Sequence, residues 1–332
     1  MTSVLFISRT GNGVGGMQTY TAVLHQALQA KDGLHVSACI HHGYALTFPL
    51  FLVRAFFAIV VFRGDVILLA DAALSPLALL KPRRTAVITH GLDVTRDIPG
   101  YRLIVGWCLR SARTVVAVSR ATGELVRKLG VDAGRLRVIS CPLPVLSSVH
   151  TNRNPSQILF LGRLVPRKGV IWFVESVLPM LASTFPHLHI VVAGTGPDAS
   201  LVTQVLGASP FRNHVSVVGY VTEEEKARLL ASSALLIVPN VPRAHDPEGF
   251  GIVCIEAGAA GLPVVAARID GLPDAVSEGV TGFLFEPESP SDCVRAVSQA
   301  FSFAWNPEEL RRTVQEKFSS AHIVERFVHD VF

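Results

Sequence analysis

The sequence predicts an α/β protein made of two doubly wound, Rossmann-like domains that face each other across a cleft. The chain has 332 residues, which is too long for one typical core and about right for two. Short apolar runs rich in β-branched residues alternate with helical patterns, as in parallel sheets covered on both faces. Residues 142–157, rich in Pro, Ser and Asn, separate these runs into two sets and are typical of a linker.

Each set of runs predicts one sheet. Strands of the first sheet are expected at residues 4–8, 35–40, 66–70, 85–90, 114–119 and 136–140. Strands of the second are expected at residues 158–162, 189–194, 215–219, 234–239, 263–267 and 282–285. Ligands of such sheets bind beyond the carboxyl ends of the strands. The segments that follow the runs are therefore where we expect a site.

The amino-acid composition indicates the cellular compartment and the kinds of binding partner to expect. The five cysteines lie far apart with no metal-ligand spacing, and "MTSVLFIS" lacks the basic flank of a secretory signal, so we expect a cytoplasmic protein. Residues 1–150 carry 16 Lys and Arg against 7 Asp and Glu, whereas residues 151–332 carry 14 against 19. This asymmetry indicates two surfaces with different partners, or serves solubility alone. We expect no nucleic-acid partner.

Residues 48–62, "FPLFLVRAFFAIVVF", form the most apolar stretch. Arg54 is the one charged residue among these 15, and a membrane span needs about 20. Two interpretations stay open. The stretch is a buried core helix, or it dips into the membrane interface with help from the basic N-terminal half. The second would make the protein peripheral on the inner face of the plasma membrane.

A glycine-rich turn follows the first strand. Gly11, Gly13 and Gly16 have the G-x-G-x-x-G spacing of a dinucleotide-binding loop. A dehydrogenase also needs an acidic residue at the end of the next strand, where this chain has His41 and His42. A glycine loop that touches an anion or the other domain is therefore favoured.

A basic turn follows the first strand of the second half. The stretch "GRLVPRKG" places Arg163 and Lys168 on a turn that Pro166 breaks and Gly169 closes. Two cations converging at the end of a strand suit a diphosphate. The alternative is an ordinary solvated basic turn.

Two carboxylates flank the stretch "GFGIVCI". Glu248 and Glu256 stand eight positions apart, and a helix is expected to begin near Ile252. Gly249 and Gly251 permit backbone amides at its N-terminus to approach a ligand closely. A carboxylate accepts two hydrogen bonds from vicinal hydroxyls, so one Glu suits a sugar and the other a ribose. The alternative is that Glu248 caps the helix and Glu256 is solvated.

Four stretches in the second half resemble the GT-B glycosyltransferases of family 4, a retaining group. They are "GRLVPRKG", "VVAGTGP", "VVGYVTEEE" and "PEGFGIVCIEAGAAGLPVVA", and the last contains the E-x7-E signature. The first half resembles the family through "GVGGMQTY", "ITHGLDV" and "AVSRAT". The resemblance implies the GT-B architecture and sugar transfer from a nucleotide diphosphate sugar, linked to UDP or GDP. The implied acceptor is a hydroxyl of a cell-surface glycan or a lipid-linked molecule.

The resemblance also implies roles for the matching residues. Arg163 and Lys168 would bind the donor diphosphate, Glu248 would contact the transferred sugar, and His90 would lie near it. These four are the expected catalytic residues. The remaining donor-binding positions are Glu256 at the ribose; Gly15 and Gly16 over the phosphates; Gly249, Phe250, Gly251 and Ile252 near the sugar; and Gly219, Tyr220 and Val221 near the base.

Domain limits and chemistry follow from the same resemblance. Residues 1–148 would be the acceptor-side domain, residues 149–306 the donor-binding domain, and residues 307–332 terminal helices, the last crossing back to the first domain. Basic side chains and a helix N-terminus would stabilise the leaving diphosphate, so we expect no cofactor and no metal ion. The chain has no D-x-D sequence.

Two departures from the family pattern bear on specificity. The turn "DGLPD", residues 270–274, stands where the family commonly has Gly-Gly-x-Pro-Glu, and the first half is short for the family. Two alternatives from other classes stay open: a non-catalytic sugar-nucleotide-binding scaffold of a polysaccharide assembly complex, and a nucleotide-sugar epimerase of the same fold. The presence of Glu248, Arg163 and Lys168 favours an enzyme over a scaffold.

Overall fold

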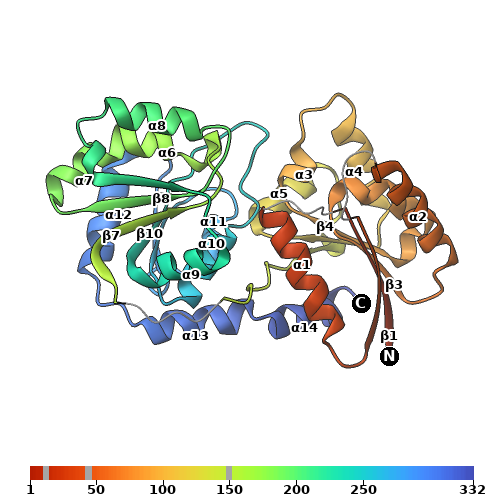
Figure 1. The fold of residues 1–332 in the computed structure, drawn as a ribbon. Helices are drawn as coiled ribbons and strands as arrows, with labels where there is room; N and C mark the ends of the chain where they lie inside the picture. The colour runs from red at the N-terminus through yellow and green to blue at the C-terminus, as the bar shows by residue number, and fades with distance from the viewer. Residues whose placement is uncertain (10–14, 42–46, 147–151) are drawn as a thin grey trace. The chain divides into compact units, whose positions relative to one another are not determined.

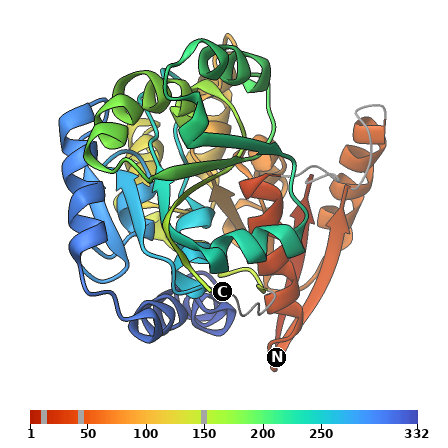
Figure 2. The same ribbon diagram turned by 60° about the vertical axis from the view of Figure 1, so that its left-hand side comes forward.

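The computed structural model describes residues 1–9, 15–41, 47–146 and 152–332. The chain divides into two compact units. Unit 1 comprises Met1–Pro144, His245–Phe250 and Lys317–Phe332, and unit 2 comprises Val145–Ala244 and Gly251–Glu316. Each unit holds a six-stranded parallel sheet with helices on both faces (Figures 1 and 2). The predicted α/β fold with two doubly wound sheets is confirmed.

The sheet of unit 1 has the strand order β2-β1-β3-β4-β5-β6. Its strands are β1 (Thr2–Ser8), β2 (Leu34–Ile40), β3 (Val66–Leu69), β4 (Thr85–Thr89), β5 (Thr114–Ala117) and β6 (Leu136–Val138). Its helices are α1 (Gly16–Gln29), α2 (Phe48–Val61), η2 (Ala72–Leu80), η3 (Pro82–Arg84), α3 (Leu92–Thr95), α4 (Tyr101–Ser111), α5 (Arg120–Lys128), η4 (Ala133–Arg135) and α14 (Ser320–Asp330). The central strands β3, β4 and β5 are buried along their whole length, because both faces of the sheet are covered.

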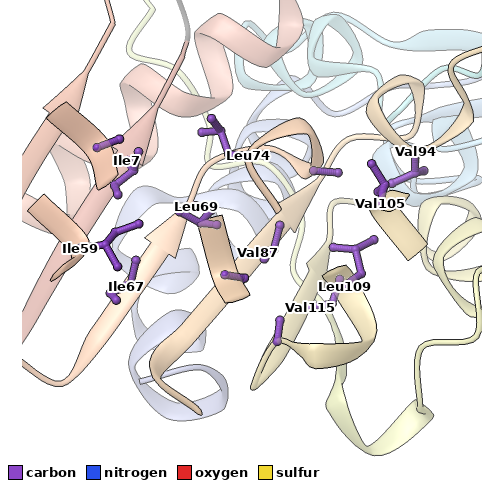
Figure 3. Close-up of a cluster of buried hydrophobic side chains, with 14 of the residues drawn as sticks. Ile7, Ile59, Ile67, Leu69, Leu74, Val87, Val94, Val105, Leu109 and Val115 are labelled. Atoms are coloured by element: carbon purple, nitrogen blue, oxygen red, sulfur yellow. The ribbon is translucent and has the colours of Figure 1, made fainter. Parts of the chain in front are cut away.

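One hydrophobic cluster fixes the helices on one face of this sheet. Ile7, Ile67 and Val115 from the strands pack with Ile59 of α2 and Leu109 of α4 in a single buried cluster (Figure 3). On the other face, α14 contacts α1 (Figure 1). The helices therefore hold the strand ends of unit 1 rigidly.

The sheet of unit 2 has the order β12-β11-β10-β7-β8-β9. Its strands are β7 (Asn154–Leu161), β8 (His189–Ala193), β9 (Val215–Gly219), β10 (Ser233–Val238), β11 (Val264–Ala267) and β12 (Gly282–Phe285). Its helices are η5 (Pro166–Lys168), α6 (Val170–Trp172), η6 (Phe173–Val177), α7 (Leu178–Thr184), α8 (Ala199–Ala208), η7 (Arg212–His214), α9 (Glu223–Ser232), α10 (Ile252–Ala259), α11 (Leu272–Ala275), α12 (Pro290–Ser302) and α13 (Pro307–Phe318).

Two sequence expectations need correction. The linker expected at residues 142–157 is too long, because β7 already begins at Asn154; residues 147–151 of that segment lie outside the described residues. The apolar stretch at residues 48–62 is not a fully buried core helix, because only Phe51, Ala55 and Ile59 of α2 are buried. In the described part of the chain, no helix combines the length and hydropathy needed to cross a membrane.

Candidate functional site

Glycines occupy the carboxyl ends of three adjacent strands in the second sheet. Gly162, Gly194 and Gly219 stand at the ends of the adjacent strands β7, β8 and β9, and Gly194 N donates to Gly219 O at 2.7 Å. A Cβ on Gly194 would lie 1.9 Å from the carbonyl oxygen of Gly162. A Cβ on Gly196 would lie 2.1 Å from that of Leu164. Glycine at these positions therefore lets the strand-end loops pack backbone against backbone, where no side chain would fit.

The segment expected near the base starts at the same edge. Gly219 has φ 72°, a conformation that L side chains rarely adopt, and the chain leaves β9 there. Tyr220 is 65% exposed and Val221 is half-buried. The tyrosine thus presents an apolar ring with a polar tip at the strand end.

The basic turn at residues 162–169 is fixed against the neighbouring strand. Gly169 has φ 67°, and a Cβ there would lie 1.9 Å from the carbonyl oxygen of Pro239, just beyond β10. Lys168 is buried, with 8% of its surface exposed, whereas Arg163 is exposed. The alternative of an ordinary solvated turn is therefore wrong for Lys168. One cation is held within the unit and the other reaches into solvent.

Glu256 lies on α10 and is buried, with 6% of its surface exposed. Its Oε1 accepts a hydrogen bond from Lys226 Nζ on α9 at 2.8 Å, and the same ammonium lies 2.6 Å from Glu223 Oε2. Burial raises the pKa of the Glu256 carboxyl above its ordinary 4.5, and the ammonium lowers it only part of the way back. Burial acts to lower the pKa of Lys226, but the two carboxylates outweigh it and raise that pKa. The alternative in which Glu256 is solvated is wrong.

The helix that carries Glu256 begins as the sequence predicts. α10 starts at Ile252, and its N-cap position is held by Gly251 rather than Glu248. Gly251 has φ 96°, and a Cβ there would lie 2.6 Å from Leu272 Cδ2. Because glycine has no side chain, the cap residue supplies no acceptor for the first backbone N–H groups of α10. These N–H groups can donate to an anionic group at the helix N-terminus.

His90 stands at the end of β4 in unit 1 and is buried, with 8% of its surface exposed. Its Nε2 lies 2.8 Å from the carbonyl oxygen of Ala70. A carbonyl only accepts, so Nε2 carries a proton and donates this hydrogen bond. The His90 backbone N donates to Asp93 Oδ1 at 2.7 Å. Backbone and ring are thus both held in place.

A buried polar network surrounds His90 and was missed in the sequence analysis. Arg9 Nε lies 2.9 Å from both carboxylate oxygens of Asp71, and Asp93 Oδ2 accepts from the Ala72 amide at 2.8 Å. Burial raises the pKa of Asp93, which lies beside Asp71, while His90 lowers it. Burial and the Asp93 carboxylate raise the pKa of Tyr101 to about 12. These side chains follow three separate strands, so no local motif joins them in the sequence.

The loop that carries Glu248 packs against unit 1. Thr95 Oγ1 donates to the carbonyl oxygen of His245 at 3.0 Å. A Cβ on Gly249 would lie 2.3 Å from the carbonyl oxygen of His90. The rings of Phe250 and Phe318 have centroids 5.6 Å apart at 68°. The half-buried Glu248 is therefore anchored on both sides, next to the residue that touches His90.

The glycine-rich turn of unit 1 leads directly into α1. The helix begins at Gly16, and Gly15 holds the N-cap position without a side-chain cap. Tyr20, in the next turn, packs edge-on against His90 with ring centroids 4.9 Å apart. Gly11, Gly13 and His42 lie outside the described residues. The ring contact of Tyr20 with His90 therefore fixes the first turns of α1 next to His90.

Two family models match this chain. The model for "Glycosyl transferases group 1" matches residues 155–302, which include every strand-end loop of unit 2 described above. The model for "Glycosyl transferase 4-like domain" matches residues 41–142. The chain belongs to the family 4-like glycosyltransferases. This membership agrees with the resemblance that the sequence motifs indicated.

Curated relatives match part of this chain. It is 29% identical over 234 residues to the D-inositol 3-phosphate glycosyltransferase of Mycolicibacterium gilvum, covering 64% of this chain and 50% of that protein. It is 28% identical over 275 residues to the GDP-mannose-dependent alpha-(1-6)-phosphatidylinositol monomannoside mannosyltransferase of Mycolicibacterium smegmatis, covering 76% and 71%. The chain spans about half the length of the curated relatives it matches first.

Solved structures support the GT-B fold. The Anabaena protein HepE in complex with UDP and glucose superposes with a TM-score of 0.73 at 16% identity, over 100% of this chain and 99% of that one. Within unit 2 of this chain, the expected donor residues Arg163, Lys168, Gly219 and Glu256 follow or lie beside neighbouring strands. Within unit 1, the Gly249 backbone lies against His90. Across the described ranges, no group of three or more His, Cys, Asp or Glu side chains is arranged to hold a metal ion.

Proposed function

We propose that this glycosyltransferase is a retaining enzyme that moves a sugar from a UDP- or GDP-linked donor to a hydroxyl group, without a metal ion. The observation that carries the proposal is the strand-end edge of unit 2. There, closely packed glycine-containing loops, a fixed basic turn and a buried carboxylate occur together inside the segment that matches the group 1 model. The UDP and glucose named for HepE, and the GDP-mannose named for the mycobacterial relative, support a nucleotide-sugar donor.

The basic turn would stabilise the leaving group. Breaking the sugar–phosphate bond leaves negative charge on the nucleoside diphosphate and gives the sugar oxocarbenium character. Arg163 and Lys168, with the N-terminus of α10, would meet that charge as it develops. Lys168 is already fixed in the unit, so its ammonium needs little reorganisation, whereas the exposed Arg163 can follow the ligand.

The carboxylates would position the two ends of the donor. Glu256, kept charged by Lys226, would accept hydrogen bonds from the ribose hydroxyls. Glu248 would contact the transferred sugar, and His90 would lie near it. For retention, the acceptor hydroxyl attacks the anomeric carbon on the face from which the diphosphate leaves. The departing phosphate oxygen takes the hydroxyl proton.

The acceptor side is assigned to unit 1. We propose a cell-surface glycan or a lipid-linked molecule as the acceptor, and a cytoplasmic enzyme that is peripheral on the inner face of the plasma membrane. The exposed apolar side of α2, within residues 48–62, supports membrane contact. The basic balance of residues 1–150 supports attraction to such a surface.

The decisive experiment combines a ligand screen with two variants. UDP, GDP and their sugar conjugates are tested for thermal stabilisation, where a ligand at a hundred times its Kd adds roughly 2.7 kcal/mol. Glu256→Ala should weaken nucleotide binding by roughly 1.5–3 kcal/mol. Glu248→Ala should lower turnover more than binding of the bare nucleotide. Wild-type binding and turnover in both variants would refute these assignments.

A second experiment tests metal independence, and the enzyme should keep its turnover in the presence of EDTA. Loss of turnover in EDTA with rescue by manganese would refute metal independence.

A further inference from the structure

Two helices of unit 1 expose large apolar side chains to solvent. Exposure reaches 79% at Leu103, 69% at Val61, 59% at Phe57 and 58% at Trp107. We call this surface the α2–α4 face, and its members are Leu50, Val53, Phe56, Phe57, Val60 and Val61 on α2 and Leu103, Ile104 and Trp107 on α4. Apolar patches rimmed by polar residues mark interaction sites.

Both helices lie on the same side of the first sheet. Phe51 and Ile59 of α2 belong to the same buried cluster as Val105 and Leu109 of α4. Figure 3 labels Ile59, Val105 and Leu109 in this cluster. The exposed side chains of the face lie on the opposite sides of these two helices, away from that cluster. A helix on the surface of a soluble protein normally carries polar residues there, so the α2–α4 face lacks the expected solvent side.

The charged residues of these two helices are all positive. Neither α2 nor α4 contains Asp or Glu, and their charged residues are Arg54, Arg102 and Arg110, all exposed. The flanking acidic residues are Asp65 after α2 and Asp97 before α4. Large apolar side chains interspersed with arginines are typical of helices that lie in a membrane interface and attract anionic headgroups. A second copy of the face would bring like charges together, which disfavours self-association.

We propose that the α2–α4 face docks this enzyme on an anionic lipid bilayer. The aromatic and aliphatic side chains enter the boundary between headgroups and acyl chains, and the arginines contact lipid phosphates. The inference deepens the membrane contact within the proposed function, because it adds α4 and names anionic lipid as the partner. It needs no assumption about the donor residues.

Trp107 provides a built-in reporter. The chain has three tryptophans, and the other two, Trp172 and Trp305, are half-buried in unit 2. Wild-type protein should bind vesicles of phosphatidylcholine with phosphatidylglycerol, with a blue shift of tryptophan emission. It should bind pure phosphatidylcholine vesicles much less and lose binding in high salt. Trp107→Phe should keep most of the binding and lose the shift.

Matched variants test the face itself. The double variant Phe57→Ser, Trp107→Ser should lose vesicle binding at least tenfold, and Arg54→Gln or Arg102→Gln should each lose about fivefold. The controls are Leu201→Ser and Arg212→Gln, exposed positions of unit 2, which should bind vesicles like wild type. Unchanged melting temperature and nucleotide affinity in the face variants show that the fold and the donor site are intact.

Several results would overturn the inference. They are no binding to anionic vesicles, equal binding to neutral ones, or equal losses in the control variants. A dimer in sedimentation that the face variants dissociate, without vesicle binding, would assign the face to a second copy instead. Failure of nucleotide binding in wild type would count against the proposed function and leave the vesicle result standing.

Discussion

At the residue scale, the ion pair between Lys226 and Glu256 decides what the buried carboxylate can do. Glu256 is almost fully buried, and burial favours the protonated acid. A protonated carboxyl gives up acceptor capacity that vicinal hydroxyls need. The ammonium of Lys226 at 2.8 Å lowers the pKa of Glu256 and so favours the charged carboxylate. It comes from another helix, 30 residues earlier in the chain, so the E-x7-E spacing alone does not reveal it.

Replacing Lys226 by Met should make stability more dependent on pH. The folded-state pKa of Glu256 already lies above its ordinary 4.5, and it should rise further without the ammonium. A carboxyl with a raised folded pKa contributes stability at low pH that is lost as the pH rises through that pKa. The melting temperature of Lys226→Met should therefore fall increasingly below that of wild type as the pH rises above 4.5, the ordinary value of the carboxyl. Breaking a buried pair costs roughly 3–5 kcal/mol.

Arg228→Met is the matched control for this variant. Arg228 pairs with Glu224, whose side chain is 70% exposed, and such surface pairs contribute about 0–1 kcal/mol. Its melting curve should run parallel to that of wild type at every pH. Nucleotide affinity of Lys226→Met should also weaken as Glu256 loses charge. Parallel pH curves for Lys226→Met and wild type would show that Lys226 does not set the state of Glu256.

At the scale of elements, close backbone contacts hold the loops at the strand ends. In unit 2, Gly194 lies against the carbonyl of Gly162, and Gly169 against that of Pro239. In unit 1, Gly249 lies against the carbonyl of His90. Because the obstacle in each case is backbone rather than a flexible side chain, the loop itself must move if a Cβ is added.

Gly249→Ala should displace the loop that carries Glu248. The added Cβ would lie 2.3 Å from the His90 carbonyl oxygen, and such overpacking costs roughly 1–3 kcal/mol. Turnover should fall more than affinity for UDP or GDP, because the donor edge of unit 2 is untouched. The control is Gly207→Ala on α8, where a Cβ meets nothing within 4 Å and a gain of about 0.4–1 kcal/mol is expected. Equal melting temperatures and turnover for the two variants would contradict the contact.

The sequence predicted these elements unevenly, for physical reasons. All twelve expected strands are present. Parallel strands that are buried on both faces consist of nearly continuous apolar, β-branched residues, so they can be recognised in the sequence. The solvent side of α2 could not be predicted, since a helix that is apolar on all sides carries no periodicity to orient it. The network of Arg9, Asp71 and Asp93 could not be predicted from the sequence either. Its members meet only because the sheet brings separate strand ends together.

At the scale of the whole molecule, the C-terminal segment belongs to both units along its length. Val314 of α13 packs near Gly258 in unit 2. Beyond Lys317 the chain is part of unit 1, where α14 contacts α1. Glu325 pairs with Lys31, and Arg326 Nη2 donates to the carbonyl oxygen of Val138 at 3.3 Å. The last helix therefore completes a unit whose other strands and helices come from the start of the chain.

Removing residues 321–332 should destabilise unit 1 selectively. Ile323, Val324, Phe327 and Val331 are buried, and each such side chain contributes about 1.5–3 kcal/mol. Their combined loss is comparable to the whole stability of a typical domain, roughly 5–15 kcal/mol. Calorimetry should show one transition moved to lower temperature and one that UDP or GDP still raises. Turnover should be lost, because the Glu248 loop packs on unit 1. The control is Glu325→Gln, which removes only an exposed ion pair and should leave the temperatures of both transitions unchanged. A truncated protein that melts and turns over like wild type would show that α14 is dispensable to unit 1.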